Sequence, residues 1–174
     1  MGLSASKRVS RTFQESPDFN SACESVYEEC LSLTQHAFPG VRPYQLLNAS
    51  DRLHHSLSTG HALIIKWVPT PPTRYQVDKA LQVVTRHSPD EEETILGRAE
   101  FKGFALELFT EAVVSNAGKA VLRRVPIGIA GIAGIGVVTR SGKDLVGTAI
   151  GVYAIGVATS IYLSLAGGIC ITGC

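Results

Sequence analysis

The first residues of the chain carry its clearest chemical signal. Gly2 follows the initial Met and Ser6 stands four residues later, an order typical of a site where myristate is attached to the glycine amine. One myristoyl chain binds a membrane only marginally, and each nearby cation adds about 1 kcal/mol against an anionic leaflet. Ser10 lies inside the basic cluster, so its phosphorylation would act as a switch that cancels most of this attraction. The cations expected to contact the membrane surface are Lys7, Arg8 and Arg11.

Cysteine and histidine are the other side chains with useful chemistry, and their spacing does not favour a metal site. Cys23 and Cys30 lie seven residues apart, on one face of a helix, and only His36 is close to them in sequence. The adjacent His54 and His55 would point about 100° apart on a helix, too far to share one ion easily. We therefore predict buried structural thiols, no metal and no cofactor.

Motifs of common enzyme classes are missing from the sequence. It contains no G-x-S-x-G, no Walker loop and no H-E-x-x-H. The run GIAGIAGIG resembles a dinucleotide loop, but it lacks the preceding strand and the later acidic residue that such a loop requires. The formal net charge is +1, which gives no general attraction to nucleic acid. We predict a protein that is not an enzyme and has no nucleic-acid partner.

The carboxy-terminal part is predicted to enter a membrane. Leu145–Ala166 runs for 22 residues without a charge, and a helix of that length spans about 33 Å, enough for a hydrocarbon core of about 30 Å. A shorter apolar run, Val125–Val138, precedes it. Two topologies are open. In the first, both runs cross as a hairpin. In the second, only the later run crosses, so that Arg140 and Lys143 stay cytosolic as the positive-inside rule favours. We prefer the hairpin because small residues recur in both runs.

These small residues predict close helix–helix packing. Their spacing of three or four residues places them along one helix face, where the backbones of two helices can approach each other, as in a glycine zipper. The partner would be the neighbouring helix of the hairpin or a second copy of the chain in a homo-oligomer. The residues concerned are Gly128, Gly131, Gly134, Gly147, Gly151, Ala154 and Ala158.

The remainder of the chain predicts an all-α protein with a cytosolic head. We expect residues 1–15 to form a flexible basic arm, and residues 167–174 to form a short tail after the membrane segment 125–166. The segment 62–68 fits either an extended connector, which we prefer, or a buried helix. The head, residues 16–124, is expected to hold about four helices, near 16–37, 43–59, 74–87 and 88–124, the last opened by a capping box at Ser88.

Two stretches also carry a family resemblance. Met1–Thr12 (MGLSASKRVSRT) and Ser32–Leu46 (SLTQHAFPGVRPYQL) resemble a family of small plant N-myristoylated membrane proteins of unknown function. The resemblance covers roughly residues 1–50. It implies a lipid-modified amino terminus and brings no activity with it.

Together these patterns favour a membrane-anchored adaptor without enzymatic activity. Its helical head would face the cytosol at the plasma membrane, an endomembrane or an organelle outer membrane, where it would hold a protein partner against the lipid surface. The absence of a secretory signal peptide fits a tail anchor. One alternative is a glycine-striped hairpin that oligomerises into a pore or shapes the bilayer, although neither apolar run contains an ionisable residue. Another is a lipid-binding head, which would need an apolar cavity.

Overall fold

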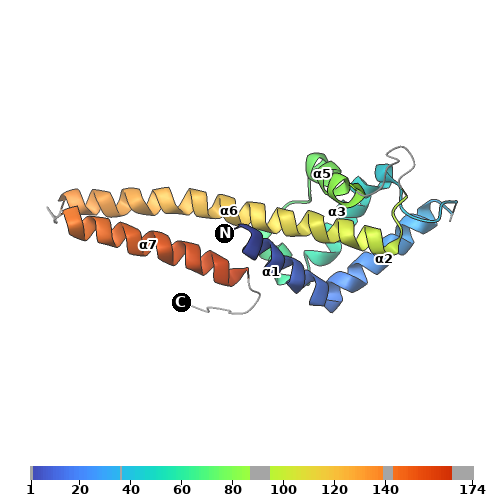
Figure 1. The fold of residues 1–174 in the computed structure, drawn as a ribbon, viewed down its shortest axis with the longest axis horizontal. Helices are drawn as coiled ribbons and strands as arrows, with labels where there is room; N and C mark the ends of the chain where they lie inside the picture. The colour runs from blue at the N-terminus through green and yellow to red at the C-terminus, as the bar shows by residue number, and fades with distance from the viewer. Residues whose placement is uncertain (1, 36, 87–94, 139–142, 166–174) are drawn as a thin grey trace. The chain divides into compact units, whose positions relative to one another are not determined.

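The structure is a computed structural model that describes residues 2–35, 37–86, 95–138 and 143–165. Over these residues the chain forms seven α-helices and one short 3-10 helix, and no β-strand. The predicted all-α class is therefore confirmed. The chain divides into two compact units, Met1–Val114 and Ser115–Cys174, and the long helix α6 (Arg98–Val138) contributes to both (Figure 1).

The first unit is a helical bundle built around α2, α3 and the beginning of α6. Helix α3 contacts α2, α4 and α5, and α1 contacts α2. Figure 1 shows these elements gathered along the first part of α6. Their bounds in chain order are α1 (Gly2–Glu15), α2 (Pro17–Leu33), the 3-10 helix η1 (Pro43–Gln45), α3 (Leu46–Leu57), α4 (Ala62–Trp67) and α5 (Arg74–Thr85).

Aromatic rings join α2 to α6 in the core of this unit. The Phe19 ring meets the Phe109 ring edge-on at 6.5 Å between centroids, and the centroids of Tyr27 and Phe101 lie 5.7 Å apart. A spacing of three and four residues puts the buried side chains of α6 on one face of the helix. They are Phe101, Phe104, Ala105, Leu108, Phe109, Ala112 and Val113.

Two helix starts agree with the capping signals in the sequence. The Ser16 hydroxyl accepts a hydrogen bond from the Phe19 backbone N–H at 3.3 Å, and α2 begins at Pro17. Before α5, the side-chain oxygen of Gln76 accepts hydrogen bonds from the backbone N–H and the hydroxyl of Thr73, at 2.9 and 3.0 Å. These bonds use polar groups that the first turn of a helix leaves without a backbone partner.

The prediction of a flexible arm over residues 1–15 was wrong, because this segment forms α1. Val9 and Phe13, four residues apart on one face of the helix, are fully buried. The Phe13 ring lies 4.9 Å from the Phe19 ring and 4.8 Å from the His61 ring, measured between centroids. The basic residues suggested an arm in solution, but two apolar side chains at helical spacing are enough to dock the segment on the bundle.

The segment 62–68 is also helical rather than extended. Helix α4 follows His61, and its Leu63, Ile64 and Trp67 are buried. This spacing of one, three and four residues fits one face of a helix. The alternative of a buried helix, which the sequence left open, is therefore the correct one.

The fourth predicted helix begins later than expected and has a different N-terminus. The predicted capping box at Ser88 lies outside the described residues. Leu96 is not helical: its backbone forms an isolated antiparallel bridge with Val41, with two N–H···O bonds of 2.9 Å. Helix α6 then starts at Arg98, where the Glu100 carboxylate accepts a hydrogen bond from the Gly97 N–H at 2.8 Å.

Gly40 makes this bridge possible. A Cβ atom at position 40 would lie 2.4 Å from the Leu96 carbonyl oxygen and 2.7 Å from a methyl carbon of Ile95. Both distances are shorter than real Cβ contacts, so any larger residue would force the two backbones apart. The bridge between Val41 and Leu96 (the clip) therefore depends on glycine at this position.

The second unit consists of the last part of α6 and helix α7 (Lys143–Ser164). Helix α6 was expected to end near Arg124, but it continues through Pro126 to Val138. Proline removes one backbone hydrogen bond from a helix, and here it does not end α6. The boundary between the two units accordingly lies between Val114 and Ser115, not at the predicted position 124. In Figure 1, α7 returns antiparallel to the end of α6.

Candidate functional site

Helix α7 has the properties of a membrane span. Among the described helices it alone is long and apolar enough to cross a bilayer, over Val146–Ser164. Only 6% of this window is buried, whereas the core helix of a soluble protein would be mostly covered. The side chains of Val152 and Ile155, near the middle of the window, are 67% and 68% exposed. An apolar helix left uncovered is compatible with a membrane anchor.

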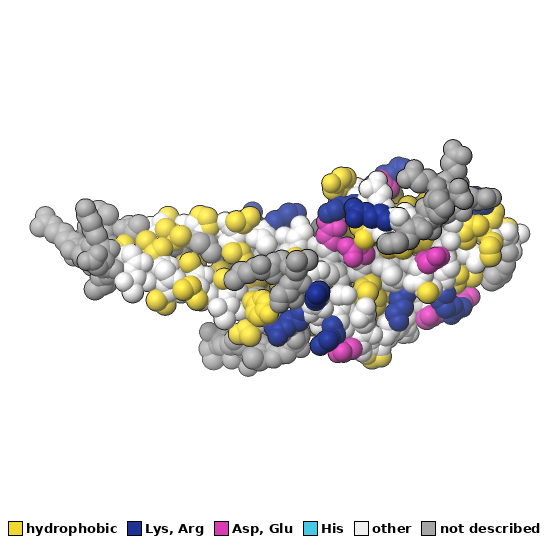
Figure 2. All heavy atoms as spheres, in the orientation of Figure 1, with side chains coloured by type: hydrophobic (Ala, Val, Ile, Leu, Met, Phe, Trp, Pro, Cys, Tyr) yellow, Lys and Arg dark blue, Asp and Glu magenta, His cyan; other side chains and the backbone are white. Residues whose placement is uncertain are grey.

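The distribution of side chains on the surface differs between the two units. Figure 2 shows hydrophobic side chains along the α6–α7 pair, and shows Lys, Arg, Asp and Glu side chains gathered over the helices of the first unit. Leu122 and Ile127, in the part of α6 that belongs to the second unit, are also largely exposed. The charged side chains thus gather over the first unit, and the exposed apolar side chains of the second unit are compatible with a membrane anchor.

The small residues of α7 share one helix face, as predicted, and part of that face is open. Among the described residues, and apart from the adjoining backbone of α7 itself, no atom lies within 4 Å of where a Cβ would stand at Gly147 or Gly151. Ala154 and Ala158 are half-buried. The side-chain surroundings of Gly128, Gly131 and Gly134 lie outside what is described, so close packing at the seven positions stays a prediction.

Helix α1 turns its basic side chains away from the bundle. Lys7 and Arg11 are four residues apart and exposed, on the side of the helix opposite Val9 and Phe13. Arg8 is exposed as well, and Ser10 is half-buried. Gly2 is the first residue of α1, so it lies at the end of this helix rather than on a free arm.

The cysteines and histidines lie in separate environments. Cys23 and Cys30 are buried, as predicted. Burial raises the pKa of the Cys23 thiol to about 12, with Lys102 opposing the shift and Glu24 adding to it, so this thiol stays protonated at neutral pH. Nε2 of His54 lies 2.7 Å from the Val68 carbonyl oxygen. Within the described residues, no three His, Cys, Asp or Glu side chains gather as metal ligands.

A groove between α2 and α3 is the strongest candidate for a partner-binding site on the first unit. Its volume is about 270 Å³, and its lining includes Leu33 at the end of α2 and Tyr44 in η1. These side chains are 59% and 69% exposed, and Leu47 on α3 is 37% exposed. Exposed large apolar side chains beside a groove are typical of surfaces that bind another protein. We call this site the α2–α3 groove.

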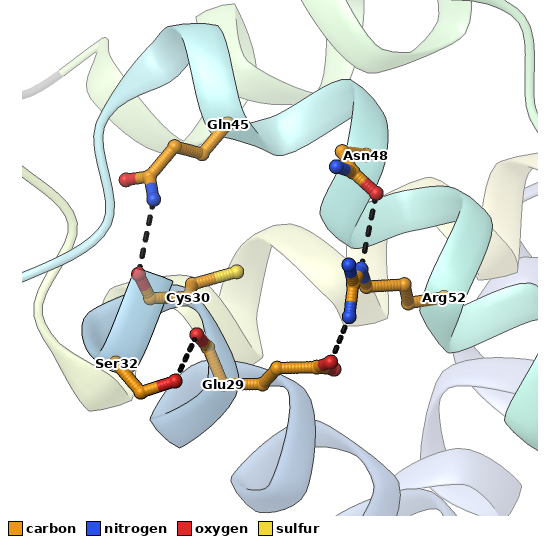
Figure 3. Close-up of polar contacts among 6 residues, drawn as sticks. All are labelled: Glu29, Cys30, Ser32, Gln45, Asn48 and Arg52. Atoms are coloured by element: carbon orange, nitrogen blue, oxygen red, sulfur yellow. Dashed lines mark hydrogen bonds and ion pairs between the residues drawn. The ribbon is translucent and has the colours of Figure 1, made fainter. Parts of the chain in front are cut away.

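Hydrogen bonds from one glutamine hold the two sides of the groove together. The Gln45 side chain donates to the Cys30 carbonyl oxygen at 3.0 Å, across the gap between η1 and α2 (Figure 3). The same side chain accepts a hydrogen bond of 3.0 Å from the Arg42 backbone N–H. The Cys30 carbonyl oxygen, near the end of α2, thus accepts a bond from Gln45 in addition to one of 3.4 Å from the Thr34 hydroxyl.

Arg52 forms the polar rim of the groove. Its guanidinium is ion-paired with Glu29 of α2 and donates a 3.1 Å hydrogen bond to the Asn48 side-chain oxygen (Figure 3). Exposed ion pairs contribute little to stability, typically below about 1 kcal/mol, but they fix the orientation of the side chains. The groove thus combines an apolar floor with a positioned polar edge, as protein interfaces do.

No pattern in the sequence by itself indicates this groove. Leu33 lies seven residues after Val26, on the face of α2 that is otherwise buried. Helix α2 ends at Leu33, however, and the following chain does not cover it. The one sign of the groove in the sequence is an apolar residue in the last turn of a helix. Such a position alone does not tell whether the side chain is buried or exposed.

Comparison of the chain with family models, curated proteins and solved structures finds no match.

Proposed function

We propose that the protein is a membrane-anchored adaptor, in which α7 holds the chain in the bilayer and the first unit binds a partner protein at the cytosolic surface. The observation that carries this proposal is the uncovered apolar surface of α7 in a chain whose first unit has a buried core of its own. A helix of this kind is stable in lipid, whereas in water it would expose a large apolar surface.

The amino-terminal helix supplies a second attachment. Lys7 and Arg11 on the free side of α1 add electrostatic attraction to an anionic leaflet, and a myristoyl group on Gly2 would add hydrophobic attachment. Because Val9 and Phe13 are used inside the bundle, α1 contributes charge to membrane binding, not apolar surface. Phosphorylation of Ser10 would oppose this attraction.

The α2–α3 groove is the proposed site of the partner. The test uses full-length protein in native membranes, with chemical crosslinking and identification of the crosslinked proteins. Substituting Leu33→Ser and Tyr44→Ser together should abolish the crosslinked partner while leaving membrane attachment unchanged. Tyr75→Ser is the matched control, because Tyr75 is 75% exposed on α5 and does not line the groove. An identical set of crosslinked proteins from wild type and the double variant would contradict the assignment of the groove.

The open space beside Gly147 and Gly151 supports a second candidate, an oligomer of α7 helices that forms a pore or shapes the bilayer. Gly151→Leu should then reduce both oligomer formation in detergent and ion flux from liposomes that contain the full chain. Gly156→Leu is the matched control, because Gly156 is equally open and lies on the opposite face of α7. A lack of flux from wild-type liposomes would count against a pore.

A further inference from the structure

A second cleft of the first unit lies where α2 begins, α3 ends and the chain turns into α4. Its volume is about 320 Å³, at the lower end of the range of about 300 to 1,000 Å³ usual for small-molecule sites. The cleft is separate from the α2–α3 groove. Its polar lining is made by Asp18, Ser21 and Ser25 of α2, Ser56 of α3, and His61 before α4.

The charge in this cleft is negative. Asp18 contributes a carboxylate, and neither Lys nor Arg is among the lining residues. Helix α3 ends at Leu57, which also lines the cleft, so the negative end of its dipole lies there together with the positive ends of α2, which begins at Pro17, and α4, which begins at Ala62. The dipole ends oppose one another, so the charge that favours a cation is that of the Asp18 carboxylate. A ligand that carries a phosphate would find no positive side chain in the lining, which disfavours nucleotides and phospholipid head groups.

The hydroxyl groups of the cleft are available to a ligand. Within the described part of the chain, the side chains of Ser21, Ser25 and Ser56 make no hydrogen bond to another protein group. Ser21 and Ser25 are four residues apart on α2, so their hydroxyls lie one above the other on the same helix face. Three oxygen acceptors next to a carboxylate suit a ligand with several N–H donors.

His61 forms a buried wall of the cleft. Its side chain is only 7% exposed, its ring lies against Phe13, and its Nδ1 has no hydrogen-bond partner. Burial lowers the pKa of His61, and the nearby Asp18 carboxylate partly opposes this shift. At neutral pH the ring is therefore uncharged and does not repel a cation.

We propose that this cleft binds a small alkylammonium ligand, with the Asp18 carboxylate as its counter-ion and the hydroxyls of Ser21, Ser25 and Ser56 as acceptors for its N–H groups. The site is independent of the proposed adaptor function, because it uses none of the groove residues. Its affinity falls as salt is added, since Asp18 is exposed and its charge is screened.

The test is a titration of the full-length protein in detergent micelles with putrescine, followed through the imidazole proton signals of His61. A matched titration uses 1,4-butanediol, which has the same chain length and no charge. We expect a saturable change of the His61 signals with putrescine that weakens with salt, and no saturable change with the diol. Equal responses to the two compounds, or no saturable response to putrescine, would overturn the proposal.

Two variants and one control localise the ligand. Asp18→Asn removes the counter-ion and should weaken putrescine binding by at least about tenfold. Ser25→Lys places a cation in the cleft and should abolish binding, while lysine has the better helix propensity and so keeps α2 intact. Asp51→Asn removes an exposed carboxylate of α3 outside the cleft and should leave the affinity unchanged. Wild-type affinity in Ser25→Lys would overturn the assignment even if Asp18→Asn failed to fold.

Discussion

The membrane assignment of α7 can be tested with two lysines. Val152 and Ile155 lie near the middle of the apolar window Val146–Ser164, and both are largely exposed. In water, replacing them with lysine would remove apolar surface and damage no core. In a bilayer, each lysine at the centre of a span costs about 2.5 to 3.5 kcal/mol, so the pair costs about 5 to 7 kcal/mol. Each 1.4 kcal/mol corresponds to about a tenfold change in an equilibrium constant. The double variant should therefore partition into membranes roughly 10⁴-fold less well.

The assay is carbonate extraction of membranes that contain the full-length protein. Wild type should remain in the membrane pellet, and so should Gly2→Ala, which removes the acceptor for a lipid. The double-lysine variant should be released. The control variant Tyr75→Lys adds a charge at an exposed residue of α5, in the first unit. This variant should stay in the membrane pellet. Retention of the double-lysine variant in a Gly2→Ala background would refute the reasoning, because neither the span nor the lipid could then account for attachment.

Three further predictions concern the first unit. Gly40→Ala should destabilise it by about 1 to 3 kcal/mol, since the new methyl group overlaps the Leu96 carbonyl oxygen; urea unfolding of the detergent-solubilised protein would show the loss. Phe13→Ala should lower the free energy of unfolding by about 3 to 5 kcal/mol in the same measurement, and α1 should then be cut more readily by a protease. If wild type and variant were cut in the same pattern, α1 would not be docked on the bundle. The free energy of unfolding should fall as the pH drops below about 6.5, because the pKa of His61 is lowered in the folded state and the unfolded state therefore binds a proton that the folded state does not. The variant His61→Gln should show a flatter dependence of stability on pH. An equally steep profile in that variant would mean that other groups cause the dependence.

The sequence predicted those parts of the fold that depend on local signals. Ser16 followed by proline marks the start of α2 within one residue, and Thr73 marks the start of α5. The uncharged run that became α7 was visible because length and apolarity alone define it. In each of these cases the physical cause lies within a few residues of the signal, so no knowledge of the rest of the chain is needed.

The parts that could not be predicted depend on distant residues. Helix α1 exists because Phe13 meets Phe19 and His61, and His61 lies almost fifty positions further along the chain. The late start of α6 follows from the pairing of Leu96 with Val41, which no local pattern near position 96 indicates. The α2–α3 groove was missed for the same reason, because the exposure of an apolar residue depends on whether other segments cover it.

The clip between Val41 and Leu96 has a consequence for how this domain tolerates change. The two backbone hydrogen bonds between Val41 and Leu96 hold the start and the end of the intervening chain together, so the separation of these two ends does not depend on the length of chain between them. A reporter peptide spliced into the exposed Pro69–Pro71 connection should therefore lengthen the excursion without altering how α2 meets α6. The Pro69–Pro71 connection is therefore a place where a probe can be attached at little cost to the rest of the fold.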